Sequence, residues 1–185
     1  MTTFVYPWYN QNEHCERELR MSLRSLKDNV LVPYNVAVVG DCPVRLADLI
    51  YIEHHREAGT DHAKCLDAAR KLQLVCNTPH VTDHFVYMAD DLALLLPFSP
   101  GDVALPIALE EVGENPRMDT LNDALMIRTV NALRSRGLQR VWNYETHMPR
   151  LFSKRRMQEI LEVYQPGENR LMIPTLYFNH FWPNE

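Results

Sequence analysis

A short apolar run that ends in two adjacent carboxylates constrains this chain more than any other feature. The run spans Phe85–Met88, and Asp90 and Asp91 follow it after a single alanine. Consecutive large apolar residues of this kind predict a strand that is buried on both faces, as in a parallel sheet covered by helices. Acids directly after such a strand lie at the carboxyl edge of the sheet, where open α/β sheets bind ligands.

The acid pair has two interpretations. Adjacent carboxylates repel each other unless a cation lies beside them, and oxygen ligands favour a hard divalent cation such as Mg²⁺ or Mn²⁺. Asp90 and Asp91 would then form a metal-diphosphate site. Alternatively, the two acids only open a turn before Pro97. The run alone gives both interpretations equal weight.

Length and composition favour one globular domain covering residues 1–185. The chain is 46% hydrophobic, which is enough for a sizeable core. Its apolar stretches are too short for a transmembrane segment, and its first residues lack the pattern of a secretory signal, so we expect a cytoplasmic protein. No CxxC pair occurs, which predicts reduced thiols rather than disulfides or zinc ligands for Cys15, Cys42, Cys65 and Cys76.

The charge is distributed unevenly along the chain. The segment from Arg128 to Arg156 contains eight basic residues and a single acid, Glu145, although the net charge of the whole chain is −5. A basic segment of this kind suits an anionic partner, such as a phosphorylated substrate, a nucleic acid or an anionic membrane surface. A solvated helix face explains some of these residues, but not the near absence of acids.

The hydrophobic pattern alternates between strands and helices. Strands are expected at Thr3–Pro7, Asn35–Gly40, Leu49–Ile52 and Phe85–Met88. Helices are expected at about 12–28, from an N-cap at Thr60 to Cys76, at 121–136 and after Ser153, with prolines punctuating 97–116. This order predicts an α/β fold with a Rossmann-like, mainly parallel sheet and helices on both faces.

Several short motifs occur in an order that resembles the GT-A class of nucleotide-sugar glycosyltransferases. They are an opening strand with aromatic residues, a Val-Val-Gly-Asp strand end, a lysine-bearing helix, and Tyr87–Asp91, which resembles the Asp-x-Asp motif with Ala89 in its first position. Thr120–Ile127 resembles the Asn-rich turn of that class. His147–Arg150 resembles the His-x-Pro segment of the related Stealth capsule-sugar phosphotransferases. The chain is short for the class, so the resemblance implies a minimal form in which the acceptor subdomain is reduced or missing.

The resemblance implies a metal-dependent glycosyltransferase that moves a sugar from a nucleotide-diphosphate donor to an acceptor hydroxyl. Asp91 would be the first ligand of Mn²⁺ or Mg²⁺, while Asp90 would share the metal or bind ribose hydroxyls. His147 would be a later ligand, because such enzymes bring a histidine from near the C-terminus to the same metal. The alternative for His147 is an ordinary loop residue.

The same resemblance implies a donor pocket. Tyr6 and Trp8 would supply a stacking surface for the base, and Asp41 would accept hydrogen bonds from the base or ribose. Lys64 would face the diphosphate near a helix start, and Asn122 belongs to the Asn-rich turn. Core packing is the alternative for Tyr6, and solvent exposure is the alternative for Lys64.

The catalytic base depends on the stereochemistry. With inversion, Asp123 or Glu145 would accept the proton of the acceptor hydroxyl, although Asp123 could instead complete a helix cap with Thr120. With retention, no protein base is obligatory. The acceptor could be a saccharide, a lipid-linked molecule or a nucleic acid such as phage-type modified DNA. The alternative functions are a Stealth-type sugar-phosphate transferase and a catalytically inactive nucleotide-sugar-binding module.

Overall fold

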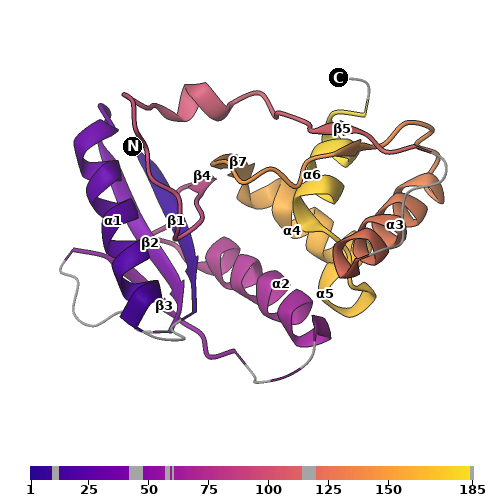
Figure 1. The fold of residues 1–185 in the computed structure, drawn as a ribbon, viewed down its shortest axis with the longest axis horizontal. Coiled ribbons are helices and arrows are strands. Elements are labelled where there is room, and N and C mark those ends of the chain that lie inside the picture. Colours follow the sequence, from indigo (N-terminus) through magenta and orange to yellow (C-terminus); the bar gives the residue numbers. More distant parts are fainter. Residues whose placement is uncertain (10–12, 42–47, 57–58, 60, 114–119, 184–185) are drawn as a thin grey trace.

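A five-stranded sheet organises the computed structural model. The structure describes residues 1–9, 13–41, 48–56, 59, 61–113 and 120–183. The strand order is β3-β2-β1-β4-β7, and β7 alone runs antiparallel to its neighbour (Figure 1). The strands are β1 (Thr2–Trp8), β2 (Tyr34–Gly40), β3 (Ile50–Glu53), β4 (His84–Tyr87) and β7 (Arg150–Ser153). The expected α/β fold with a mainly parallel sheet is therefore confirmed.

The central strands are buried on both faces. β1 pairs with β2 over its whole length, from Thr2 opposite Tyr34 to Trp8 opposite Gly40, and pairs with β4 on its other side. Residues 3–6 and 36–40 are all buried. A strand covered on both sides needs apolar residues at successive positions, which explains the continuous apolar runs in the sequence.

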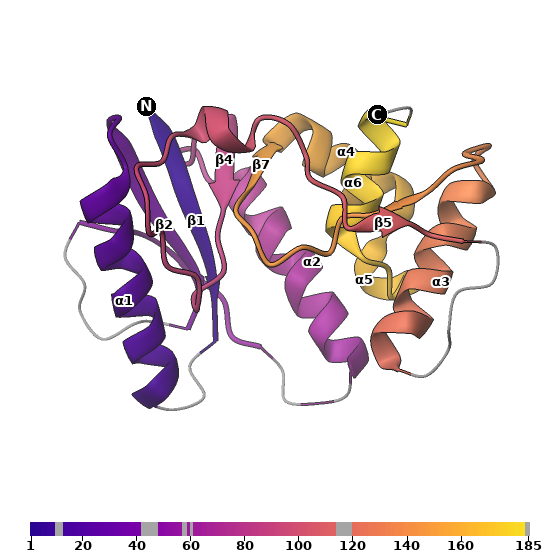
Figure 2. The same cartoon turned by 45° about the horizontal axis from the view of Figure 1, so that its top comes forward.

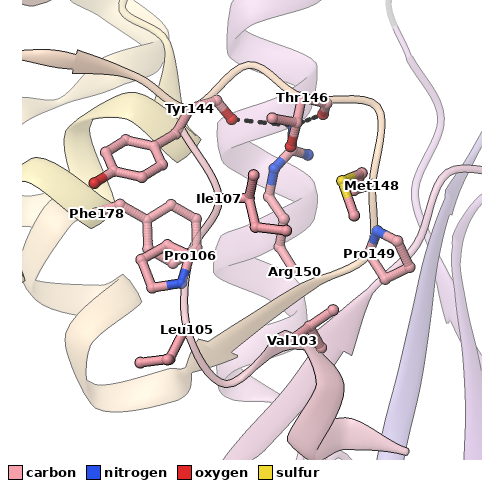
Figure 3. A pocket seen from close by; sticks show the side chains of 10 residues that line it. All are labelled: Val103, Leu105, Pro106, Ile107, Tyr144, Thr146, Met148, Pro149, Arg150 and Phe178. Atoms are coloured by element: carbon pink, nitrogen blue, oxygen red, sulfur yellow. Dashed lines mark hydrogen bonds between the residues drawn. The ribbon is translucent and has the colours of Figure 1, made fainter. Parts of the chain in front are cut away.

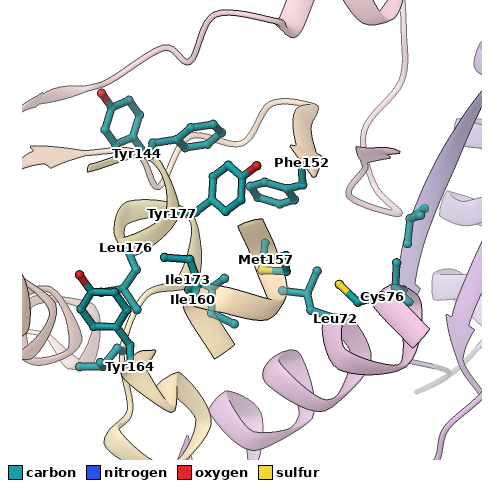
Figure 4. Close-up of a cluster of buried hydrophobic side chains, with 14 of the residues drawn as sticks. Leu72, Cys76, Tyr144, Phe152, Met157, Ile160, Tyr164, Ile173, Leu176 and Tyr177 are labelled. Atoms are coloured by element: carbon teal, nitrogen blue, oxygen red, sulfur yellow. The ribbon is translucent and has the colours of Figure 1, made fainter. Parts of the chain in front are cut away.

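Helices cover both faces of this sheet (Figures 1 and 2). On one face, α1 (Glu13–Asn29) packs Leu19 and Leu26 against alternate side chains of β1. On the other face lie α2 (Asp61–Asn77), α4 (Lys154–Tyr164) and α6 (Ile173–Phe181). Figure 4 shows part of this second core, formed by Leu72, Cys76, Tyr144, Phe152, Met157, Ile160, Tyr164, Ile173, Leu176 and Tyr177.

The remaining elements lie beyond the second face of the sheet or along its edge. The helix α3 (Leu121–Arg134) lies at the end of the molecule opposite α1 (Figure 1). The short strands β5 (Glu110–Glu111) and β6 (Trp142–Asn143) form an antiparallel pair, and the other short elements are η1 (Pro100–Val103) and α5 (Pro166–Asn169). No helix in the described part of the chain is long and apolar enough to cross a membrane.

The C-terminal third differs from the sequence prediction. The helix expected after Ser153 is α4, which ends at Tyr164, whereas α5 and α6 were not predicted. Gln165 and Arg170 adopt left-handed conformations with φ of 45° and 56° and separate these three helices. β5, β6 and β7 were not predicted from the hydrophobic pattern. The proposed N-cap Thr60 and Cys42 lie outside the described residues.

Candidate functional site

The strand order reverses beside β1, and this places the carboxyl ends of β1 and β4 side by side at one edge of the sheet. From β1 the chain continues outward through β2 to β3, and then returns to pair β4 with the other side of β1. Trp8 ends β1, while Asp90 and Asp91 follow β4. The backbone N–H of Met88 donates to the carbonyl oxygen of Val5 at 2.9 Å, which extends the contact between the two strands. Such reversal points are the usual ligand sites of open α/β sheets.

The antiparallel strand β7 brings a histidine to the same edge. Arg150, the first residue of β7, lies opposite Tyr87, the last residue of β4. Residues just before β7 therefore reach the carboxyl edge of the parallel strands. There, His147 Nε2 lies 2.8 Å from Asp91 Oδ1, although the two residues are 56 positions apart. Both side chains are open to solvent, at 70% and 47% exposure.

Asp90 is partly buried beside this pair. Burial raises the pKa of the Asp90 carboxyl above its usual value, and the charges of Asp91 and Glu18 raise it further. A hydrogen bond from its own backbone N–H and the charge of Lys71 act in the opposite direction. Acidic charge therefore accumulates at the carboxyl end of β4, which favours a cation there.

A buried lysine at the end of β1 was not among the expected site residues. Lys71, only 4% exposed, donates from Nζ to the carbonyl oxygen of Trp8 at 3.1 Å and lies 3.0 Å from Asp67 Oδ2. His54 Nε2 lies 3.0 Å from the other oxygen of Asp67. The i, i+4 spacing of Asp67 and Lys71 on α2 was visible in the sequence, but their burial was not. This network links the carboxyl ends of β1 and β3.

A second histidine cluster lies at the end of β2. His55 contacts Asp41 Oδ1 at 3.1 Å and Glu53 Oε1 at 3.2 Å, and these hydrogen bonds raise the pKa of the His55 imidazole. Asp41 thus lies at the carboxyl edge, as expected for a residue after a parallel strand. A surface hollow of about 340 Å³ is lined by His54, His55, Ala63, Leu66, Asp67 and Arg70.

The prediction that Tyr6 and Trp8 form a stacking surface for the base is wrong. Tyr6 and Trp8 are both 0% exposed, so neither presents a ring face to a ligand in this structure. The hydroxyl of Tyr6 accepts a hydrogen bond from Ser22 at 3.1 Å inside the core under α1, and burial raises its pKa. Trp8 packs in the same core cluster. Both side chains point to the α1 face because successive residues of a strand alternate between faces.

Two other expected donor residues lie apart from the acid pair. Lys64 is exposed on α2, about two helical turns before Lys71, so Lys71 is the lysine that reaches the end of β1. Asn122 is exposed in the first turn of α3, at the end of the molecule opposite α1 (Figure 1). The structure does not bring Asn122 to Asp91.

Both candidate bases are hydrogen-bonded at the start of a helix. Asp123 completes a capping box at the start of α3, where its Oδ2 accepts from the Thr120 N–H at 2.8 Å and the Thr120 hydroxyl accepts from the Asp123 N–H. Glu145 Oε1 accepts from both the N–H and the hydroxyl of Thr175, at 3.1 and 2.9 Å. Burial raises the pKa of Glu145. Asp123 is thus part of a helix cap at the end of the molecule opposite α1, and its assignment as catalytic base is corrected. Glu145 lies two residues before His147 and stays a candidate base that is held at the start of α6.

The basic residues 150–156 are divided between the two edges of the sheet. Arg150 lies at the carboxyl edge, whereas Ser153 pairs with His84 at the amino end of β4, and α4 begins there. Lys154 Nζ donates to the carbonyl oxygen of Thr78, and the Arg156 guanidinium lies over the rings of Phe181 and Trp182. The cluster at the start of α4 is thus separated from Asp91 by the length of β4.

A divalent cation at this edge would need further ligands besides the protein side chains. The described residues contain no group of three or more His, Cys, Asp or Glu side chains close enough to hold a metal by themselves. Asp91 and His147 supply one oxygen and one nitrogen that face each other, with Asp90 next in the chain. This donor set suits Mn²⁺ or Mg²⁺, which commonly take their remaining ligands from water and substrate phosphates.

In comparisons with known proteins, no protein-family model and no curated protein matches the chain.

Proposed function

We propose that this protein is a glycosyltransferase that uses a nucleotide-diphosphate sugar together with a divalent cation. The observation that carries the proposal is the contact between Asp91 and His147 at the strand-order reversal. Two potential metal ligands from distant parts of the chain meet at the edge where α/β sheets bind ligands. The motif order in the sequence supports the same function.

In this proposal Asp91 and His147 hold the cation, and Asp90 shares it or accepts hydrogen bonds from ribose hydroxyls. The cation would neutralise the negative charge that develops on the leaving diphosphate. Lys71 keeps the end of β1 in place through the Trp8 carbonyl and contributes positive charge beside Asp90. Asp41 accepts hydrogen bonds from the base or ribose at the end of β2.

The positions of the candidate bases bear on the type of transfer. Asp123 and Glu145 are both committed to helix ends. The proposal therefore favours transfer with retention of configuration, for which no protein base is obligatory. The same observation favours a second candidate, a nucleotide-sugar-binding module without catalytic activity. The sugar-phosphate transferase gains no comparable support, because Arg150 of its motif hydrogen-bonds to backbone carbonyls.

Calorimetry with nucleoside diphosphates tests the metal and donor together. We expect binding to be much tighter with Mn²⁺ or Mg²⁺ than with EDTA, and Asp91→Asn to remove that difference. Asp83→Asn is the matched control, because Asp83 is an exposed aspartate at the amino end of the same strand. Equal binding in EDTA, or an Asp91→Asn protein that still responds to Mn²⁺, contradicts the proposal.

A donor screen separates the two candidate functions. Purified protein is incubated with a panel of nucleotide sugars and Mn²⁺, and release of nucleoside diphosphate is measured with and without saccharide, lipid-linked and DNA acceptors. Metal-dependent release supports the transferase. Tight metal-dependent donor binding without release under any condition supports the binding module instead.

A further inference from the structure

The segment 142–149 carries His147 to the acid pair, and its hydrogen bonds point to one residue that fixes it. We propose that Arg150 is the positioning residue that holds His147 against Asp91. The proposal rests on the proposed function, in which the contact between His147 and Asp91 binds the cation. The contact itself can be tested without metal or donor.

Arg150 binds the backbone directly before the histidine. Its Nη2 donates to the carbonyl oxygen of Thr146 and, at 3.3 Å, to that of Tyr144 (Figure 3). The first of these carbonyls belongs to the peptide bond that joins Thr146 to His147. The Arg150 guanidinium thus joins both ends of the turn between Tyr144 and the start of β7. By fixing the backbone of this turn, it orients the side chain of His147.

The earlier part of the segment is fixed by α6. Asn179 pairs with the N–H and carbonyl of Trp142 at 2.8 and 2.7 Å, and Thr175 hydrogen-bonds to both Tyr144 and Glu145. These contacts end at residue 145. Within the described part of the chain, the hydrogen bonds that reach residues 146–149 come from Arg150 and from Asp91 itself.

Packing does not replace the hydrogen bonds of Arg150. His147 and Met148 are exposed, and beneath the turn lies a cavity of about 20 Å³, room for about one water molecule. This cavity lies between two segments of the chain (Figure 3). One contributes Thr146, Met148, Pro149 and Arg150, and the other contributes Val103 and residues 105–107. The turn is exposed to solvent on one side and borders this small cavity on the other, so the hydrogen bonds of Arg150 contribute to its shape.

The free-energy cost of burying Arg150 also indicates that this residue does more than fill space in the core. The Arg150 Nε is buried without a hydrogen-bond partner among the described residues. Burying a charged group with an unpaired donor costs stability, and an apolar side chain of similar length avoids that cost. Arg150 also interacts electrostatically with the buried Glu145, and its positive charge lowers the pKa of that carboxyl. Its position therefore combines charge compensation of Glu145 with hydrogen bonds to the turn.

The test follows the imidazole signals of His147 by NMR in metal-free protein. In wild type, Asp91→Asn should shift these signals, because the carboxylate is 2.8 Å from Nε2. In an Arg150→Met background, the same substitution should leave them nearly unchanged. Arg150→Lys should restore part of the response, since it returns a donor to the turn. Arg155→Met is the control, an exposed arginine at the opposite edge that should keep the full wild-type response.

Two further measurements separate positioning from general stability and from the proposed function. Thermal unfolding identifies a variant that is merely destabilised. If folded Arg150→Met protein still shows the full wild-type response to Asp91→Asn, the positioning role is overturned. Where wild type binds Mn²⁺, Arg150→Met should weaken that binding about tenfold, a typical loss for a residue that orients a metal ligand. Absence of Mn²⁺ binding in wild type, both alone and with nucleoside diphosphate, refutes the metal site, while the imidazole signals still decide the role of Arg150.

Discussion

The carboxylate of Asp90 destabilises the ligand-free fold, because burial raises its pKa above the usual 3.8. The folded state then binds a proton more readily than the unfolded state, so stability falls as pH rises from about 3.8 through the folded pKa. Asp90→Asn removes this penalty. We expect the variant to unfold about 2 °C higher at pH 7, a modest shift because Asp90 is only partly buried.

The pH dependence of the Asp90→Asn effect is the stricter part of this prediction. The gain should be complete at pH 7 and should disappear below about pH 3.8, where both states of wild type are protonated. Thermal unfolding followed by circular dichroism over this range measures it. A variant that is less stable than wild type at pH 7 contradicts the assignment of Asp90 as a destabilising charge.

Cys76 gives a second prediction at the scale of a residue. Burial raises the pKa of its thiol to about 12, so the reactive thiolate is scarce in the folded protein. A thiol reagent at pH 8 should label Cys76 only after unfolding, and Cys76→Ser should leave the labelling of native protein unchanged. Rapid labelling of Cys76 in native protein, located by mass spectrometry, is the contrary outcome.

Sequence reasoning identified residue types at this site better than their surroundings. The family resemblance selected Asp91 and His147, and these two side chains are in contact. The same resemblance selected Tyr6 and Trp8, which are buried because β1 is covered on both faces. A motif indicates which chemistry a side chain could perform, but exposure depends on packing partners that are distant in the sequence.

At the scale of elements, the end of β2 depends on a glycine. Gly40 has a φ of 138°, and a Cβ there would lie 1.9 Å from the Trp8 carbonyl oxygen. Gly40→Ala should therefore force β1 and β2 apart and cost about 3 kcal/mol in the free energy of unfolding. Urea unfolding measures this cost. Gly113→Ala is the control, since a Cβ at Gly113 meets no atom within 4 Å, and its effect should stay within about 0.5 kcal/mol.

The capping box of α3 offers a test of the corrected role of Asp123. Thr120→Ala removes the hydroxyl that accepts from the Asp123 N–H and should cost about 1 kcal/mol of stability. Donor binding and any transfer activity should not change, because α3 lies at the end of the molecule opposite α1 (Figure 1). Asn122→Ala in the same turn is the control for stability. An Asp123→Asn protein that folds but loses activity specifically would restore the catalytic role.

The predictability of elements depended on their length and periodicity. The long helices α1 and α2 and the buried strands β1, β2 and β4 were located within a few residues. β7 was missed because it has four residues, of which Arg150 and Ser153 are polar, so no clear period arises. Its antiparallel pairing with β4 depends on how α6 and the segment 142–149 pack, and this is not encoded in any local pattern.

At the scale of the whole molecule, the basic residues at the start of α4 and the acid pair lie at opposite edges of the sheet. Arg155 and Arg156 are exposed at the start of α4, beside the amino end of β4. If they contact a nucleic acid, DNA affinity should fall steeply with salt, and replacing both with alanine should reduce the log-log slope by up to about two units. Fluorescence anisotropy with labelled DNA at several salt concentrations measures this.

Nucleoside diphosphate binding should not change in that double variant, because the substitutions lie away from Asp91. Lack of DNA binding at low salt in wild type contradicts a nucleic-acid acceptor and leaves saccharide or lipid-linked acceptors. A large loss of nucleotide binding in the double variant contradicts the separation of the two edges.

The strand order also has a consequence for synthesis on the ribosome. β1 is made first but lies in the middle of the sheet, and β7, which covers the free side of β4, is made more than sixty residues after β4. Until then the growing chain exposes an unpaired apolar edge at Phe85 and Val86, the kind of edge that recruits strands from other chains. A chain that stops before residue 150 should therefore aggregate as it leaves the ribosome, and this protein should depend on chaperones until its last strand has been translated.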